Sequence, residues 1–360
     1  MDFNQTYERT VTQLVTKAIR IGDEIKEDHL RLRQLTDDAL EILKRIGILR
    51  VHSPDGADLS KISEAPASAS DGSFQLVGGA NGVWFVPLSS SLVIFSKGIR
   101  FSPEIKINAD IRTIDERKQP NVSYTAEMLM LSSETRILQS WSQESPEKIV
   151  HFLDGPIIDP PRPVDEEYVS TRASALLNCL DKKIRLLGCV KRLLGSPLLD
   201  HLSTILQEPE KGRMANFSSD ANVVYHVFTR TSLALESVIY TTPIEIKASN
   251  PAYQPYKEAG LSIHSMYFQG SSRTSPFRVE IPAKADSVPD LEKLGLETAV
   301  ALSAWSCPGY DLPLPIIIAH DKCNIRKGCA EVLYDEIITR SASSDMFDNL
   351  VRTKLGKEVF

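Results

Sequence analysis

The sequence predicts an α/β protein built on a mixed β-sheet flanked by helices, with an N-terminal helical extension and further helices near the C-terminus. Three observations support this fold class. Apolar residues recur at helical spacing over residues 5–50. From Phe74 the pattern changes to short runs of β-branched and aromatic residues separated by glycine and proline. Beyond residue 122, helix-like and strand-like segments alternate.

The composition is that of an ordinary globular protein. The chain has 360 residues, 42% hydrophobic and 24% charged, which excludes collagen-like, disordered and coiled-coil classes. Its five cysteines form no Cys-x-x-Cys pair, which argues against a zinc site or a disulfide framework. The sequence shows no membrane-spanning apolar segment and no signal peptide, so we expect a cytoplasmic protein without membrane attachment. The net charge of −6 limits any DNA contact to a local basic groove or a surface shared with a partner.

The N-terminal region is expected to hold two helices followed by a linker. Apolar positions over residues 11–21 define the first helix, and those over residues 35–46 define the second. Thr36 is a suitable N-cap for the second helix, and Gly47 is a suitable end for it. Residues 52–70 are rich in Ser, Ala, Pro and Asp, which is typical of a loop.

The central region is expected to begin with short antiparallel strands, followed by a helix, a strand, a helix and a strand. These elements are predicted at Phe74–Val77, Val83–Pro87, Leu92–Phe95, Ile105–Ile107, 122–143, Ile149–Leu153, 165–181 and 184–191. A helix and four strands then follow, at Leu198–Gln207, Val223–Phe228, Ser237–Ile246, Ser265–Gln269 and Phe277–Ile281. Two or three helices are expected from Asp290 onward. This order of elements is that of a ribonuclease H-like fold.

Acidic residues occur where a ribonuclease H-like sheet gathers them: on the first strand, on the first helix, at the end of a later strand, and near the C-terminus. The candidates, in that order, are Asp71, Glu127 or Glu134, Asp154, and His320 with Asp321. Carboxylate oxygens and an imidazole nitrogen suit Mg²⁺ or Mn²⁺. Two such ions about 4 Å apart would activate a water and stabilise the leaving oxygen of a phosphodiester. Spacing alone does not decide between the two glutamates, which lie on one helix face.

Each candidate also has a structural interpretation. Asp-Gly is a common turn dipeptide, a helical Glu is usually solvated, and a lone His is often a hydrogen-bonded structural residue. The joint placement favours a metal site, because a carboxylate beside a buried strand needs a partner. Lys191 and Arg278 end strands that should approach the same sheet edge, so they are candidates for phosphate contacts or ordinary surface cations.

Several segments resemble the NurA nuclease family. Asp71-Gly72-Ser73 is similar to its N-terminal acidic motif, and residues 153–158 (Leu-Asp-Gly-Pro-Ile-Ile) are similar to its second one. Gly188–Arg192, Phe277–Pro282 and Gly309–Leu314 with Ala319-His320 resemble later family segments. The resemblance covers about residues 71–325. Asp311 departs from the family pattern, which has Pro after the tyrosine.

The resemblance implies a manganese-dependent active site holding two ions, with Mg²⁺ as the alternative metal. Asp71, Glu134, Asp154 and His320 would be the metal ligands and catalytic residues, with Tyr310 close by. It also implies three regions, which are a helical segment and linker (1–66), the nuclease domain (67–345) and a C-terminal tail (346–360).

The family resemblance further implies 5′-to-3′ exonuclease action on DNA, together with single-strand endonuclease action. It implies a homodimer that works beside the hexameric HerA translocase in the resection of single- and double-stranded DNA ends during repair. A non-catalytic scaffold of the same fold that binds DNA or a motor is the main alternative. A nucleotide- or sugar-handling enzyme of the actin-like branch is a weaker one, because the sequence has no phosphate-binding loop.

Overall fold

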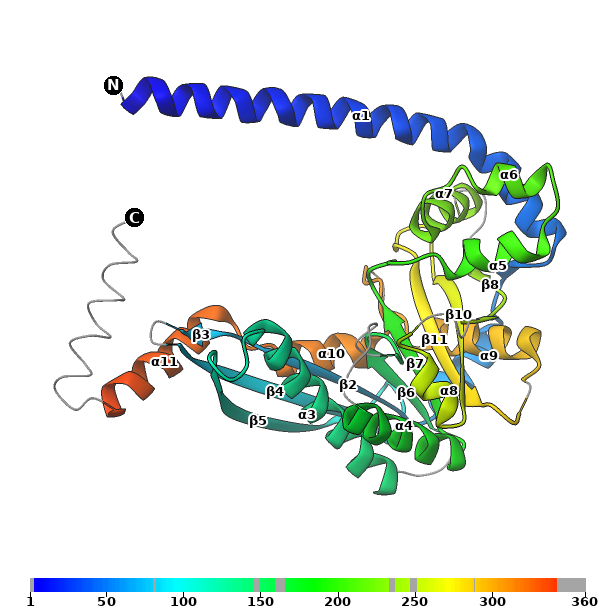
Figure 1. Ribbon diagram of the computed structural model, residues 1–360. Helices are drawn as coiled ribbons and strands as arrows, with labels where there is room; N and C mark the ends of the chain where they lie inside the picture. The colour runs from blue at the N-terminus through cyan, green and yellow to red at the C-terminus, as the bar shows by residue number, and fades with distance from the viewer. Residues whose placement is uncertain are drawn as a thin grey trace.

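One mixed sheet of eleven strands organises the molecule (Figure 1). The structure is a computed structural model, which describes residues 3–79, 82–144, 149–158, 166–232, 237–246, 251–287, 289–307 and 309–341. The strands are β1 (Leu49–His52), β2 (Ala67–Phe74), β3 (Val77–Gly78), β4 (Val83–Phe95), β5 (Glu104–Asp115), β6 (Val150–Asp154), β7 (Arg185–Val190), β8 (Val238–Thr241), β9 (Ile244–Glu245), β10 (Leu261–Gln269) and β11 (Phe277–Lys284). The helices are α1 (Phe3–Arg45), α2 (Gly56–Ser63), α3 (Val122–Glu144), α4 (Glu166–Asp181), α5 (Pro197–Ile205), α6 (Glu210–Met214), α7 (Asp220–Ser232), α8 (Gln254–Glu258), α9 (Leu291–Ala304), α10 (Leu314–Cys323) and α11 (Lys327–Ser341).

The central five strands confirm the predicted ribonuclease H-like fold. They lie in the order β5-β4-β2-β6-β7, with β4 antiparallel to both β2 and β5. The strands β2, β6 and β7 are parallel to one another and are connected through α3 and α4. Beyond β7 the sheet continues through the antiparallel strands β11, β10, β8 and β1.

Helices cover both faces of this sheet and create three main hydrophobic cores. The first core lies between the sheet and the helices α3 and α4. The second lies on the opposite face, beneath α9 and α10. The third joins the C-terminal half of α1 to α5, α6 and α7 at the end of the sheet that contains β8. Within the described part of the chain, no helix combines the length and the apolarity that crossing a membrane requires.

The N-terminal region differs from the sequence prediction. Instead of two helices it forms the single helix α1, which continues through Thr36 and ends before Gly47 at φ +73°. The Thr36 hydroxyl donates a hydrogen bond to the Leu32 carbonyl one turn earlier. Its hydrogen-bond partner therefore lies within the helix, and Thr36 does not act as a cap. Residues 52–70, expected to be a loop, contain α2 and the first half of β2, with β1 ending at His52.

The predicted strand at Val223–Phe228 is wrong, because this segment lies inside the helix α7. Its apolar residues Val223, Val224, Val227 and Phe228 are all buried, at the spacing of a helix that faces a core. A short run of β-branched residues does not distinguish a buried strand from a buried helix. The Asp220 carboxylate accepts hydrogen bonds from the amides of Leu198 and Leu199 at 2.7 and 2.9 Å, which ties α7 to the start of α5.

Several strand boundaries also differ from those predicted from the sequence. The two strands expected between Val83 and Phe95 form the single strand β4, and β5 extends to Asp115. The strand β2 begins at Ala67 and ends at Phe74, whereas the first strand of the central region was predicted at Phe74–Val77, so Asp71 lies inside the strand. The predicted tail at residues 346–360 lies outside the described residues.

Candidate metal centre

The register of three parallel strands brings the acidic residues together. Ser70 of β2 lies opposite Leu153 of β6, so the next residues on the two strands, Asp71 and Asp154, are neighbours. Asp154 in turn lies opposite Cys189 of β7, two residues before Lys191. Because parallel strands end at the same sheet edge, side chains distant in sequence meet there.

His320 completes a cluster of three potential ligands. Its Nδ1 lies 2.8 Å from Asp71 Oδ2 and 3.5 Å from Asp154 Oδ2. One ligand atom from each of these residues lies within 4.8 Å of the others. The helix α10 presents His320 to the sheet, and the Ser91 hydroxyl of β4 anchors this helix by a 2.7 Å hydrogen bond to the Ala319 carbonyl.

The electrostatics of the cluster fit a divalent cation. Burial and, after it, the charge of Asp154 raise the pKa of Asp71 to about 6, although the hydrogen bond and charge of His320 act in the opposite direction. The Cys323 thiol donates to Asp71 Oδ2 at 3.3 Å, and burial together with Asp71 raises the pKa of this thiol, so it remains protonated. Two crowded carboxylates and one imidazole form a hard oxygen and nitrogen donor set that suits Mn²⁺ or Mg²⁺.

Glu134 lies beside this cluster on α3 but is not one of its three members. Its side chain is buried, and a Cβ added to Gly72 would lie 3.6 Å from Glu134 Oε2 and 2.4 Å from Met130 Sδ. Gly72 therefore allows α3 to approach the strand that bears Asp71. The alternative candidate, Glu127, is half-buried two turns earlier in the helix.

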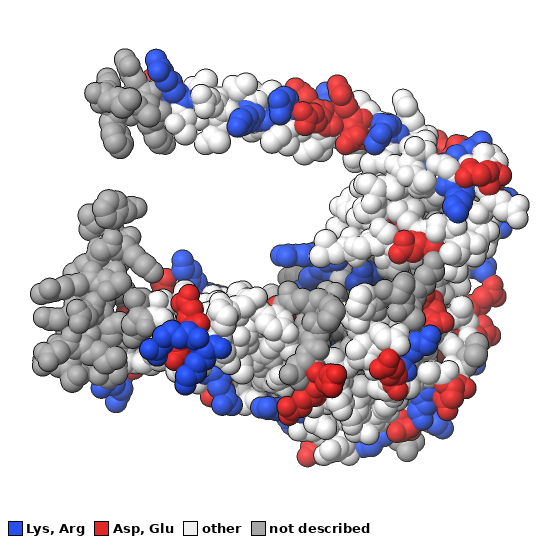
Figure 2. Space-filling model, in the orientation of Figure 1, with Lys and Arg blue, Asp and Glu red and all other residues white. Residues whose placement is uncertain are grey.

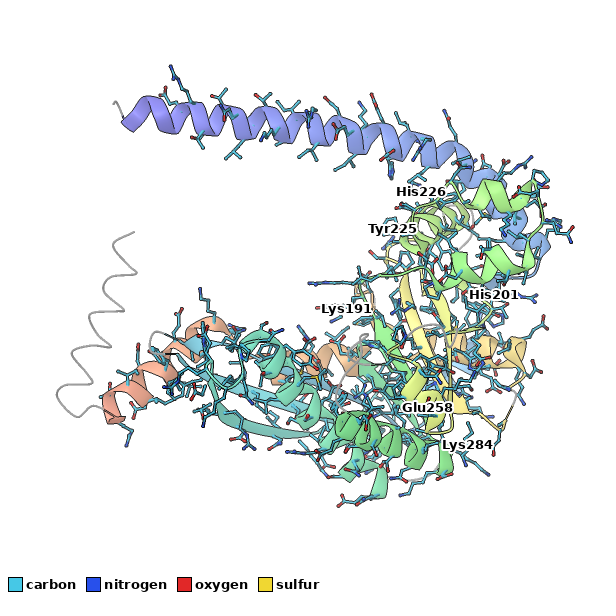
Figure 3. The ribbon with its side chains drawn as sticks, in the orientation of Figure 1. Lys191, His201, Tyr225, His226, Glu258 and Lys284 are labelled. Atoms are coloured by element: carbon cyan, nitrogen blue, oxygen red, sulfur yellow. The ribbon has the colours of Figure 1, made fainter. Side chains whose placement is uncertain are left out.

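Lys191 reaches the cluster from the end of β7. Its Nζ donates a hydrogen bond to Asp154 Oδ2 at 2.8 Å, and about half of its side chain is exposed. Figure 3 shows Lys191 extending toward the open hollow of the molecule. Figure 2 shows Lys and Arg side chains gathered on this concave side. The ammonium group is therefore both a partner of the site and accessible to an anion.

The loop after Asp154 is held by buried charged residues that the sequence analysis did not identify. Glu280 Oε2 accepts hydrogen bonds from the amides of Ile157 and Ile158 at 2.9 and 3.4 Å. From the other side, Arg172 donates to the carbonyls of Pro156 and Ile157 at 3.2 and 3.4 Å. Arg172 could not be recognised from its sequence position, because an arginine on a helix is usually exposed.

The loop also depends on a glycine in β7. A Cβ added to Gly188 would lie 2.8 Å from the Gly155 carbonyl oxygen and 3.0 Å from the Ile157 nitrogen. Both contacts are with backbone atoms, which cannot move aside as a flexible side chain can. The glycine therefore allows the loop to pass close over β7.

A buried histidine joins β2 to β6 one layer below the cluster. The His151 ring lies 2.8 Å from the Ser68 hydroxyl and 3.1 Å from the Ser70 hydroxyl, and it packs on Trp141. Burial and, after it, the charge of Arg172 lower the pKa of His151 to about 3. The imidazole is thus neutral at physiological pH and links the two strands that bear Asp71 and Asp154.

Two further predicted site residues, Arg278 and Tyr310, are not members of the cluster of three potential ligands. Arg278 is only 8% exposed, and it donates to the Leu194 carbonyl at 2.7 Å and pairs with Glu280 at 3.0 Å. Arg278 therefore supports Glu280, which holds the loop after Asp154. Tyr310 is 54% exposed in the connection between α9 and α10, and its side chain makes no hydrogen bond with any described residue.

Cys323 and Ser91, which touch the site, were not identified from the sequence. Cys323 lies three residues after His320, and this helical spacing was the available signal for it. Ser91 lies opposite Asp71 in the antiparallel pairing of β2 with β4, so only the strand register reveals its position.

Comparisons with known proteins agree on one family. The family model of the NurA domain matches residues 62–325. The crystal structure of the NurA nuclease from Sulfolobus solfataricus is similar with a TM-score of 0.60 and 12% identity, covering 92% of this chain and 98% of that chain. A second NurA crystal structure has a TM-score of 0.50 and 10% identity, covering 93% and 99%. A NurA structure bound to dAMP and manganese has a TM-score of 0.45 and 11% identity, covering 96% and 99%. No curated protein matches the chain.

We predict that Asp71→Asn stabilises the metal-free protein at neutral and alkaline pH. Asp71 has a pKa of about 6 when folded against an ordinary value of 3.8. Its contribution to stability is therefore full below about pH 4 and is lost as the pH rises through about 6. We expect the variant to exceed the wild type by on the order of 2 kcal/mol at pH 8 in a chelator, with the difference shrinking toward pH 4.

Thermal unfolding over this pH range measures the effect. Asp321→Asn is the matched control, because it removes an exposed carboxylate one residue after His320. Equal stabilities of wild type and Asp71→Asn at pH 8, or equal gains in both variants, would contradict the crowding of carboxylates described above.

We predict that Gly188→Ala displaces the loop after Asp154, because the new Cβ meets backbone atoms of Gly155 and Ile157. The cost should be about 1–3 kcal/mol, the usual range for overpacking, with weaker metal binding as well. Chemical denaturation and metal titration measure the two effects. Gly56→Ala is the control, since its Cβ meets nothing within 4 Å. Unchanged stability and metal affinity in Gly188→Ala would show that the loop accommodates the methyl group.

Proposed function

We propose, from the premise that this chain belongs to the NurA family, that it is a divalent-metal-dependent nuclease that hydrolyses phosphodiester bonds in DNA. The observation that carries this proposal is the convergence of Asp71, Asp154 and His320 from three separate elements on one sheet edge. Crowding two carboxylates at a partly buried position is unfavourable unless a cation neutralises them. A non-catalytic scaffold would have no need to maintain such an arrangement.

In this proposal, Asp71, Asp154 and His320 hold the catalytic ion and Glu134 adds a ligand from α3. When bound, a divalent cation supplies positive charge beside the phosphate and promotes the ionisation of water. The two aspartates bind it only when they are ionised, and His320 only when it is neutral. Because the pKa of Asp71 is about 6 without a cation, metal affinity should rise as the pH increases through this value. A second ion in the same site is part of the proposal and follows from the family resemblance.

The surrounding residues position these ligands. Ser91 fixes the helix that carries His320, and Glu280 with Arg172 fixes the loop that follows Asp154. Lys191 shares the Asp154 oxygen that faces His320, and its ammonium group is exposed to the hollow. We assign Lys191 to binding a phosphate of the DNA backbone, since a half-exposed ammonium beside the site provides a charge-assisted donor.

The proposal extends to the finer activity that the family resemblance implies. This is 5′-to-3′ exonuclease action with single-strand endonuclease action, in DNA end resection beside a HerA-type translocase. A translocase would supply the DNA-holding surface that a chain with a net charge of −6 provides only locally. A homodimer is likewise proposed.

We predict that Asp154→Asn abolishes metal-dependent cleavage without unfolding the protein. The amide keeps the size of the side chain but loses the charge that a cation requires, so activity should fall by at least about 100-fold. End-labelled single- and double-stranded DNA, incubated with Mn²⁺, Mg²⁺ or EDTA, measures the effect. The same digests, with either end labelled, give the polarity.

The control for this test is wild type with and without the translocase. Cleavage by Asp154→Asn at the wild-type rate would refute the assignment of the site. A wild-type protein that cleaves nothing with any metal, even beside the translocase, would favour the scaffold.

We predict that Glu134→Gln loses cleavage whereas Glu127→Gln retains most of it. The two glutamates share a helix and a face, but only Glu134 is buried beside Gly72, next to Asp71. The two variants are therefore matched in chemistry and differ in position. Steady-state cleavage rates with Mn²⁺ distinguish them. If Glu127→Gln is the inactive variant, the ligand on α3 has been assigned to the wrong turn.

A further inference from the structure

A polar groove lies between α1 and α7, where the N-terminal part of α1 leaves the body of the protein (Figure 1). Its volume is about 420 Å³, and none of the residues that line it belongs to the acidic cluster. The residues that give the groove its character are His29, Arg33 and Asp37 of α1, and Tyr225, His226 and Arg230 of α7. The groove therefore combines basic groups with an aromatic ring, at a place that the acidic cluster does not use.

The charged side chains of the groove favour an anion. Arg230 forms an ion pair with Asp37 at 3.2 Å, so these two charges offset each other. Arg33 makes neither an ion pair nor a hydrogen bond with any other residue that the structure describes. Its guanidinium group therefore gives the groove a net positive charge. Guanidinium groups are well suited to phosphate, because they donate two parallel hydrogen bonds to its oxygens.

Two histidines in the groove strengthen this preference. The rings of His29 and His226 lie with their centroids 4.6 Å apart. Burial and, after it, the charge of His29 lower the pKa of His226. Two protonated rings this close repel each other, so a bound anion would stabilise both in the charged form. A metal ion is a poorer ligand here, because the described residues offer no cluster of three His, Cys, Asp or Glu ligands at this place.

Tyr225 adds a flat apolar surface beside these donors. It is 51% exposed, whereas the preceding residue of α7, Val224, is buried in the third core. Figure 3 shows Lys191, Tyr225 and His226 along the inner side of the hollow. Exposed aromatic rings stack with nucleobases whose faces are free, as they are in single-stranded DNA. The bases of a duplex already stack on one another, so this ring favours a single strand.

We propose that the groove between α1 and α7 binds single-stranded DNA, on the same strand that occupies the metal centre. One base stacks on Tyr225, and Arg33 with the two histidines binds a neighbouring phosphate. Lys191 lies on the same inner side of the hollow, so one strand contacts both places. The inference rests on the proposed nuclease function, because that function makes DNA the ligand of the hollow. A strand too short to reach the groove is then held at the metal centre alone.

The first experiment measures the binding of fluorescent oligothymidine to the full chain by anisotropy, in a chelator so that no strand is cleaved. Tyr225→Ala should weaken the binding of a strand of about 30 nucleotides roughly tenfold, whereas Tyr225→Phe keeps the ring and should bind as the wild type does. Phe101→Ala is the matched control, because Phe101 is 56% exposed but lies between β4 and β5. A blunt duplex should bind equally well to all four proteins.

The second experiment measures how this binding depends on salt. Arg33→Gln should lower the slope of log affinity against log salt concentration by about 0.7, the value for one lost phosphate contact of a single strand. Arg31→Gln is the matched control, because Arg31 lies on the same helix but pairs with Asp28 and does not line the groove. It should leave the slope unchanged.

The third experiment compares cleavage of long and short strands with Mn²⁺. Tyr225→Ala should lower kcat/KM far more for strands of about 30 nucleotides than for strands of about 4. A chain that binds single strands through Tyr225 but cleaves none would support the groove and count against the proposed nuclease function.

Four results would overturn the proposal. These are equal losses of binding in Tyr225→Ala and Phe101→Ala, a Tyr225→Phe variant as weak as Tyr225→Ala, and equal salt slopes in the two arginine variants. The fourth is free thymidine monophosphate whose binding depends on Tyr225 while that of the strands does not, because the groove would then be a mononucleotide site.

Discussion

The parallel pairing of β2 with β6 is the constraint on which the rest of the site depends. It fixes Asp71 and Asp154 as neighbours on adjacent strands. Buried His151, hydrogen-bonded to Ser68 and Ser70, joins the same two strands one layer below. The strand pairing holds two acidic groups side by side, and these repel each other when both are ionised. Burial and this repulsion together raise the pKa of Asp71.

The neighbouring structure compensates for this unfavourable pair in two ways. Nearby side chains stabilise the ionised carboxylates directly, since His320 and Cys323 contact Asp71 and Lys191 donates a hydrogen bond to Asp154. Buried ionic residues farther out hold the backbone so that the pair does not relax apart. Arg172 donates a hydrogen bond to a carbonyl of the loop after Asp154, and Glu280 accepts one from an amide of the same loop. Arg278, expected to bind DNA, belongs to this outer group through Glu280.

The sequence predicted the fold and the neighbourhood of the site because both depend on local patterns. A strand that ends in Asp154 and a motif that begins at Asp71 are visible without the structure, and the fold order then places them together. The errors lie where tertiary context decides. The segment Val223–Phe228 has strand-like residues but lies in a buried helix. Thr36 was expected to cap a helix, but its hydroxyl donates a hydrogen bond to a carbonyl inside one. The register of β2 with β4 reveals Ser91, and the packing of α10 on the sheet shows that Cys323 contacts Asp71.

The unbroken sheet has a mechanical consequence. Hydrogen-bonded strands run without interruption from β1, which follows α1, to β2 and β4 at the acidic cluster. The C-terminal half of α1 is fixed to this sheet through β1 and the third core. A force on α1 would therefore be transmitted through the backbone hydrogen bonds of the sheet to the strands that carry the carboxylates. The number of strands and the spacing between them therefore set the distance between the end of α1 and the acidic cluster.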